Sequence, residues 1–166
     1  MGLKEDKLKI LQDAMGIELN GIELYKVAAE KTEDKQAKEF FLFLSKEEEK
    51  HFNTLKEWYI EISKGKTPEV KLEEMDKPAY KHIFSDEFKK NLKGKNFEYS
   101  VLNTGIMLEK NSMEFYHKQS EEAKTDEEKE LFKKLENWES KHYQMLLNEY
   151  DELKIEFWRA NRFSPF

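Results

Sequence analysis

Six ionisable side chains form a repeated pattern in this chain. Each half contains one isolated glutamate followed by a Glu-x-x-His motif, and the second copy lies 91 positions after the first. Carboxylates and imidazoles together are the ligands that iron, manganese and zinc take from proteins. The pattern therefore predicts a metal centre built from six residues. They are Glu18, Glu48 and His51 in the first half, and Glu109, Glu139 and His142 in the second.

The placement of these residues requires that their charge be compensated. The four glutamates stand where the helical apolar pattern predicts buried Leu or Ile side chains. A buried carboxylate without a partner is costly, and carboxylates that converge repel one another. Two divalent cations would balance four carboxylates, and neutral histidines would complete the coordination. We therefore expect two metal ions per chain. The absence of sulfur ligands suits iron or manganese and leaves zinc open.

Other residues imitate parts of this pattern. A single Glu-x-x-His motif is a weak signal in a chain so rich in glutamate. Glu114 and His117 have the same spacing, but Glu114 lies about 140° around the helix from Glu109, off the apolar seam. We expect Glu114 to face solvent. We expect the same of His82, which has no such partner.

Two further glutamates flank Glu48. We assign Glu47 and Glu49 to a charged outer face, although Glu47 also lies one turn from His51. The repeat favours Glu48 as the ligand, because the position equivalent to Glu47 in the second half is Trp138.

Two tyrosines share the helical faces of the isolated glutamates. Tyr25 and Tyr116 each follow their glutamate by seven positions, which is two turns along the same face. They are either plain core aromatics, or their hydroxyl groups hydrogen-bond a ligand carboxylate of the other half.

Four long helical stretches must position these groups. Apolar residues recur at helical spacing over about 3–31, 35–63, 97–123 and from 125 onward. Asp34 is a plausible N-cap of the second stretch, and Thr125 with Glu128 has the form of a capping box before the fourth. Because short turns separate the members of each pair, the pattern predicts two antiparallel hairpins that form an all-α four-helix bundle.

The hairpins are joined by a long connection that Gly65, Pro68, Pro78 and Gly94 interrupt. Only residues 85–93 are expected to form a short helix there. A connection of this length lets the second and third long helices run parallel, and it relates the hairpins by a pseudo-two-fold axis. We read residues 1–166 as one domain, with hairpins at about 3–63 and 97–158 and a crossover at about 64–96. The aromatic tail at 155–166 is expected to pack on the bundle or on another subunit.

Composition excludes several classes of function. The net charge is −6 without a basic block, which argues against nucleic-acid binding. No apolar run is long enough to cross a membrane, and the start is too polar for a signal peptide. The 166 residues contain no cysteine, so disulfides and iron–sulfur clusters are absent from them. We therefore expect a cytoplasmic protein.

The motif pair resembles a known group of metalloproteins, the ferritin-like di-iron carboxylate superfamily and within it the rubrerythrin branch. The resemblance covers about residues 8–62 and 99–153. It implies a ferritin-like bundle, two iron ions, a homodimer or larger assembly, and oxidoreductase chemistry with peroxide or dioxygen. The motifs that carry it are Glu48-Glu49-Lys50-His51 with Glu18 and Tyr25, and Glu139-Ser140-Lys141-His142 with Glu109 and Tyr116.

The chain departs from the rubrerythrin pattern in two respects. Rubrerythrins proper carry a rubredoxin module with four cysteine ligands, whereas these residues contain none. Any electron donor is then expected to be external, such as a separate rubredoxin. Rubrerythrins also have an extra glutamate three residues after the third-helix ligand, where this chain has Ser112, and Gly21 is its first-half equivalent. This substitution puts peroxidase activity in question.

Three functional hypotheses follow. The leading one is a rubrerythrin-like oxidoreductase that reduces peroxide or dioxygen. The second is a ferroxidase or iron-binding protein without a reductive cycle. The third is a helical module that is stabilised by a redox-inert metal and binds partners.

Overall fold

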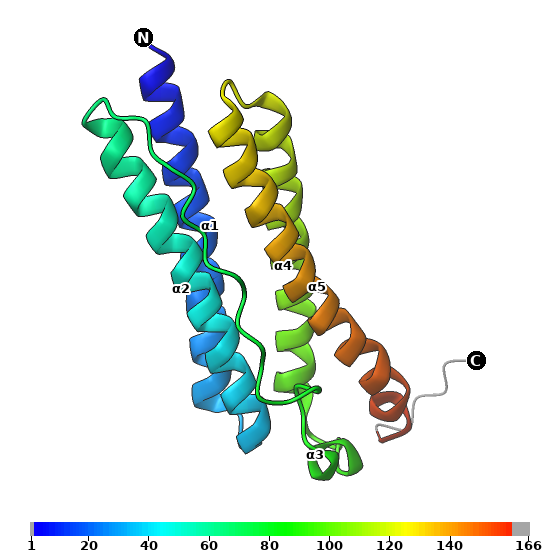
Figure 1. The fold of residues 1–166 in the computed structure, drawn as a ribbon. Coiled ribbons are helices and arrows are strands. Elements are labelled where there is room, and N and C mark those ends of the chain that lie inside the picture. The colour runs from blue at the N-terminus through cyan, green and yellow to red at the C-terminus, as the bar shows by residue number, and fades with distance from the viewer. Residues whose placement is uncertain (1, 161–166) are drawn as a thin grey trace.

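The computed structural model describes residues 2–160, and this part of the chain is all-helical, as predicted. Four long helices form two hairpins, and a short helix lies in the connection between them (Figure 1). The helices are α1 (Leu3–Lys31), α2 (Lys35–Ser63), α3 (Asp86–Lys90), α4 (Asn96–Glu122) and α5 (Asp126–Ala160).

Capping residues set the tight turn within each hairpin. The Asp34 carboxylate accepts a hydrogen bond from the Ala37 backbone N–H at 3.1 Å, which confirms it as the N-cap of α2. The Thr125 hydroxyl accepts one from the Glu128 N–H at 3.2 Å at the start of α5. As a result α1 packs antiparallel to α2, α4 packs antiparallel to α5, and α1 also contacts α4 (Figure 1).

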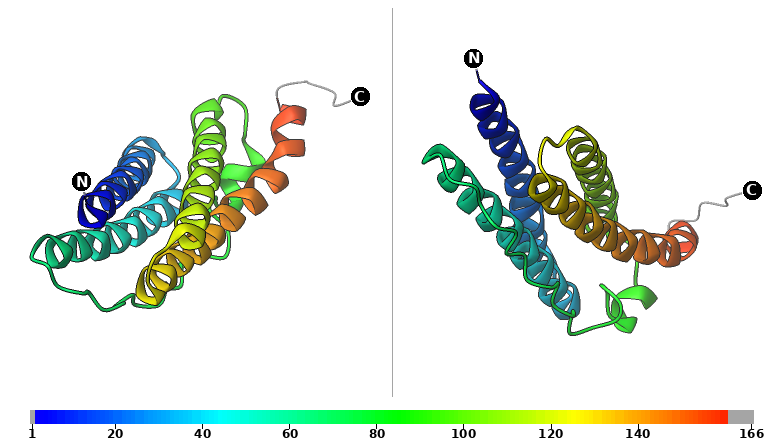
Figure 2. Two further views of the ribbon diagram at one scale, coloured as in Figure 1. Left: turned by 90° about the horizontal axis from the view of Figure 1, so that it is seen from above. Right: turned by 45° about the horizontal axis from the view of Figure 1, so that its top comes forward.

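The crossover runs along the bundle from the end of α2 to the start of α4 (Figures 1 and 2). It therefore returns the chain to the opposite end, so that α2 and α4 run parallel, as predicted. Gly65 and Gly94, near its two ends, have φ values of +76° and +80°, a region that glycine adopts without steric cost. The short helix is shorter than predicted, because Asn91 leaves the helical conformation with φ −132° and ψ 66°.

The apolar core is divided into two clusters by a layer of buried polar residues. One cluster contains Tyr25, Phe41 and Leu44 and is covered by the crossover residues Ile83, Phe84, Phe88 and Leu92. The other contains Leu11, Trp58, Tyr116 and Phe132 and lies toward the opposite end of the bundle. The predicted metal residues occupy the layer between the two clusters.

Only part of the aromatic tail lies within the described residues. Trp158 is half-buried, and the Lys154 ammonium lies 5.2 Å from its ring centroid. The expected packing of Phe163 and Phe166 concerns residues outside the described range. None of the described helices is long and apolar enough to cross a lipid bilayer.

Candidate metal centre

All four long helices contribute to one buried polar cluster. Helix α1 supplies one carboxylate and α4 another, while α2 and α5 each supply a carboxylate and an imidazole. Every one of these side chains is at most 1% exposed. The structure therefore brings together all six residues that the repeat predicts: Glu18, Glu48, His51, Glu109, Glu139 and His142.

The six side chains form two overlapping groups of candidate ligands. One group consists of Glu18, Glu48, His51 and Glu139, and its ligand atoms lie within 4.8 Å of one another. The second group consists of Glu48, Glu109, Glu139 and His142, and its ligand atoms also lie within 4.8 Å of one another. Because Glu48 and Glu139 belong to both groups, the arrangement can hold two cations that share two carboxylates.

The histidines face these carboxylates through the same ring nitrogen. His51 Nδ1 lies 2.8 Å from Glu139 Oε1 and 3.2 Å from Glu18 Oε2. His142 Nδ1 lies 2.7 Å from Glu48 Oε1 and 3.8 Å from Glu109 Oε2. The two imidazole rings are nearly parallel, with centroids 5.7 Å apart. Each histidine thus approaches the glutamate of the opposite Glu-x-x-His motif, as a pseudo-two-fold axis requires.

Several of these atoms have no hydrogen-bond partner among the described residues. They include Glu48 Oε1, Glu109 Oε2, both carboxylate oxygens of Glu139 and His142 Nδ1. Some of these atoms lie close to one another, but they are not aligned for a hydrogen bond. A buried polar atom without a partner costs about 1–3 kcal/mol, and more when it is charged. Coordination of a cation would satisfy these oxygens and nitrogens together, so the donor set fits a pair of metal ions.

The two tyrosines connect the hairpins at this layer. The Tyr25 hydroxyl donates a hydrogen bond to Glu109 Oε1, and the Tyr116 hydroxyl donates one to Glu18 Oε1. Each bond joins a tyrosine of one hairpin to the isolated glutamate of the other. The sequence left open whether these tyrosines are plain core aromatics or hydrogen-bond partners of the ligand carboxylates. The geometry supports the hydrogen bonds, and both rings are also fully buried.

Comparison with known proteins agrees with this geometry. The model of the Rubrerythrin family matches residues 9–150, which include all six cluster residues. The chain belongs to the rubrerythrin family. No curated protein and no solved structure matched the chain. The family assignment therefore depends on the family model and on the site itself.

The isolated glutamates of this rubrerythrin-family site favour their neutral form without a metal. Burial raises the pKa of Glu18 well above its usual range, and the charges of Glu139 and Glu48 raise it further. Burial and the charges of the same two carboxylates also raise the pKa of Glu109. In the metal-free protein both groups therefore hold their protons to a higher pH than an exposed glutamate does.

The pKa values of the glutamates in the two Glu-x-x-His motifs shift in the opposite direction. Burial tends to raise the pKa of Glu48 and of Glu139, but the facing imidazoles outweigh it and lower both values. Burial would lower the histidine pKa values, yet the carboxylates raise that of His51 well above its usual range and that of His142 to about 9. In the metal-free cluster the imidazolium groups and the ionised carboxylates of the two motifs therefore stabilise each other, whereas the isolated glutamates are shifted toward their protonated form.

The structure corrects two assignments made from the sequence. Glu47 is 1% exposed, so its assignment to the outer face is wrong. The Lys50 ammonium lies 2.8 Å from one of its oxygens and is itself close to Asp76 of the crossover, which compensates the buried charge. The prediction that His82 faces solvent is also corrected, because the residue is only partly exposed. Its Nδ1 lies 3.5 Å from Glu149 Oε2, since the crossover packs against α5 at this point.

The remaining assignments among the imitating residues are confirmed. The Glu114 side chain is 66% exposed, as predicted, and that of its motif partner His117 is 63% exposed. The Glu49 side chain is 43% exposed and lies on the partly buried outer side of α2. Sequence reasoning did not identify the packing of Trp138 on His51, with ring centroids 4.9 Å apart. The available signal was the replacement of a glutamate by tryptophan in the second copy of the repeat.

Gly21 makes room for a shared carboxylate. A Cβ atom at this position would lie 3.0 Å from Glu48 Cγ and 3.3 Å from its Cδ. We expect Gly21→Ala to displace the Glu48 carboxylate and to weaken metal binding about tenfold, the scale seen for groups that orient ligands. Competition with a chromophoric chelator measures this change.

Gly16→Ala, on the same helix, is the matched control. A Cβ atom there would meet nothing within 4 Å. This variant is expected to retain wild-type metal affinity. Equal metal affinity in Gly21→Ala and the wild type would contradict the role of Gly21.

Proposed function

We propose that this protein is a di-iron carboxylate oxidoreductase that reduces peroxide or dioxygen with electrons from an external donor. The observation that supports the proposal is the pair of overlapping ligand groups that share Glu48 and Glu139 in a fully buried layer. Oxygen and imidazole ligands suit iron, with manganese as the closest alternative. A homodimer and a separate rubredoxin-type donor belong to the same proposal.

The residues of the chain have distinct tasks in this proposal. Glu18 and His51 would hold one ion, Glu109 and His142 the other, and Glu48 with Glu139 would hold both. A pair of iron ions held by these residues would supply the two electrons that cleavage of an O–O bond requires. Tyr25 and Tyr116 orient the isolated glutamates through their hydrogen bonds and fix which carboxylate oxygens face the ions.

Burial and proton supply complete the arrangement. The apolar clusters on both sides of the layer limit access of bulk water to the site. Reduction of hydrogen peroxide to two waters consumes two electrons and two protons. The raised pKa values of Glu18, Glu109 and the two tyrosines keep protons within hydrogen-bond reach of the site.

Rapid mixing of the di-ferrous protein with hydrogen peroxide tests the proposal. We expect oxidation of two ferrous ions per peroxide, at a rate at least about 100-fold above that of free ferrous ion, the lower range of proximity and general acid–base effects. His142→Ala should abolish the acceleration, whereas His117→Ala, which alters the exposed motif, should retain it. Rates equal to those of free ferrous ion would exclude the proposed activity.

Ser112 supports a second candidate, a ferroxidase without a reductive cycle. It occupies the position of the additional rubrerythrin glutamate, is buried, and donates its hydroxyl to the Leu108 carbonyl oxygen at 2.9 Å. It therefore offers no further carboxylate to the site. Faster oxidation by dioxygen than by peroxide, with ferric iron retained after one turnover, would favour this candidate.

A further inference from the structure

The pseudo-two-fold axis relates two aromatic pairs that flank the metal layer. Tyr25 stacks on Phe41 with centroids 6.4 Å apart, and their equivalents Tyr116 and Phe132 stack at 6.2 Å. The first pair is covered by the crossover, because the ring of Phe84 packs edge-on against Phe41 at 6.1 Å. The ends of the bundle can therefore be compared residue by residue.

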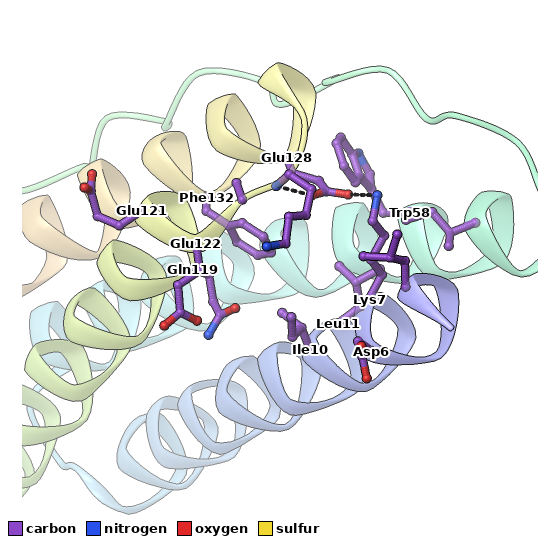
Figure 3. Close-up of a pocket in the computed structure, with 14 residues that line it drawn as sticks. Asp6, Lys7, Ile10, Leu11, Trp58, Gln119, Glu121, Glu122, Glu128 and Phe132 are labelled. Atoms are coloured by element: carbon purple, nitrogen blue, oxygen red, sulfur yellow. Dashed lines mark hydrogen bonds and ion pairs between the residues drawn. The ribbon is translucent and has the colours of Figure 1, made fainter. Parts of the chain in front are cut away.

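Phe132 of the second pair lines a cleft of about 430 Å³. The cleft lies where α1 and α5 begin and α2 and α4 end, and Figure 3 shows Phe132 and Trp58 together with Ile10 and Leu11 of α1. No residue of the crossover lines it. Val70 and Leu72 of the crossover do pack on the same apolar cluster, but outside the cleft.

The apolar walls of the cleft have covered counterparts at the other end. Each of five lining residues has a repeat equivalent 91 positions away that is at most 5% exposed, and the difference between the two ends lies in Ile10 and Ile62, which are only partly buried. The pairs are Ile10 with Val101, Leu11 with Leu102, Trp58 with Glu149, Ile62 with Leu153, and Phe132 with Phe41.

The covered end also indicates which chemistry fits such walls. Phe84 supplies an aromatic ring, and Glu149 accepts a hydrogen bond from the Phe84 backbone N–H at 3.0 Å. An aromatic ring, followed at its base by a backbone N–H that donates to a carboxylate, therefore packs at the covered end on residues equivalent to those of the cleft. At the rim of the cleft, Lys124 and Gln119 can donate hydrogen bonds, and Glu121 and Glu122 can accept them.

We propose that the cleft binds a planar molecule of the quinone and hydroquinone class, which acts as the electron donor to the metal centre. The assignment of an electron donor rests on the proposed function, whereas the binding does not. The volume lies within the range of small-molecule sites, and a bicyclic quinone matches the apolar walls and the polar rim. The described chain contains no cysteine-based redox centre that could take this role.

The cleft lies close enough to the cluster for this role. Phe132 precedes Glu139 by seven residues, and Trp58 follows His51 by seven, which corresponds to about 10 Å along each helix. The Tyr116 ring lies between Phe132 and Glu18, with which it forms the hydrogen bond described above. Oxidation of the hydroquinone to the quinone would release two protons to solvent at the open rim and two electrons, one for each of the two ferric ions that the cluster would hold.

Titration of the metal-free protein with 2-methyl-1,4-naphthoquinone tests the binding. We expect saturable quenching of tryptophan fluorescence with a 1:1 stoichiometry by calorimetry. Ile10→Trp should fill the cleft and weaken binding at least tenfold, and Ala123→Trp, on the half-buried turn, provides a second filling variant. Leu42→Trp adds the same chromophore on the exposed face of α2 and should bind like the wild type. Absent saturation, or equal binding in all variants whose circular dichroism is native, would overturn the proposal.

Anaerobic reduction of the iron-loaded, oxidised protein tests the electron transfer. The hydroquinone form should reduce the wild type and the Leu42→Trp variant at the same rate, and the filling variants at least tenfold more slowly. Dithionite should reduce all of them alike. Binding without any difference between the variants in reduction rate would overturn the assignment as electron donor. A protein that binds the quinone but does not react with peroxide would refute the proposed function and leave the binding site intact.

Discussion

Glu48→Gln is expected to lose both metal ions, whereas Glu18→Gln should lose one preferentially. Glu48 belongs to both ligand groups and Glu18 to only one. Replacement by glutamine keeps the volume but removes a negative charge and one coordinating oxygen. Metal analysis after dialysis against a weak chelator should give about two ions per chain for the wild type. We expect almost none for Glu48→Gln and about one for Glu18→Gln.

The repeat and an exposed motif provide the controls for this experiment. Glu139→Gln should behave like Glu48→Gln, and Glu109→Gln like Glu18→Gln, because the pseudo-two-fold axis exchanges the members of each pair. Glu114→Gln changes an exposed glutamate with the same motif spacing and should retain both ions. Loss of a single ion in Glu48→Gln, or of both in Glu114→Gln, would contradict the shared-ligand arrangement.

The sequence contained most of the information about the metal layer. Its two copies have the same spacing, and helical geometry places equivalent residues on equivalent faces. The apolar residues on the same helical faces then place the glutamates and histidines in the interior, where their charges must be compensated by one another or by metal ions. For this reason the six residues, the antiparallel hairpins and the parallel run of α2 and α4 could all be predicted.

The features that sequence analysis missed depend on contacts with the crossover. Glu47 is buried because Lys50 and Asp76 compensate it, and Asp76 lies in a segment without helical periodicity. His82 belongs to the same irregular segment and approaches Glu149 only because Phe84 anchors there. Periodicity cannot predict where an irregular segment lies on a surface. The cleft beside Phe132 was likewise not predictable, because it depends on which end the crossover covers.

Binding of metal should release protons near pH 7. In the metal-free protein, burial raises the pKa of Glu18 and Glu109, and the carboxylates raise the pKa of His51 well above its usual range and that of His142 to about 9. Metal ligands must be deprotonated, so two divalent cations displace the protons that these groups hold. Calorimetry in buffers of different ionisation enthalpy measures the number of protons released. Binding without proton release would contradict these pKa directions.

The same protonation pattern sets the pH dependence of stability. A histidine whose pKa rises from 6.5 to about 9 on folding, as for His142, contributes stability in full below pH 6.5 and loses it as the pH rises through 9. The raised pKa values of Glu18 and Glu109 act in the same direction, because the folded form binds protons that the unfolded chain releases. Melting temperature of the metal-free protein should therefore fall between about pH 6 and 9.

Bound metal ions take the place of the protons that the cluster loses as the pH rises. They should therefore oppose the fall in melting temperature. The difference in melting temperature between the loaded and the metal-free protein is expected to widen as the pH rises, because fewer protons then compete with the ions. The metal-free double variant Glu18→Gln with Glu109→Gln mimics the protonated carboxyl groups permanently. It should therefore lose less stability at alkaline pH than the wild type does. A wild-type melting temperature that rises toward pH 9 without metal would show that the unfolded chain binds more protons than the folded protein, against the raised pKa values inferred here.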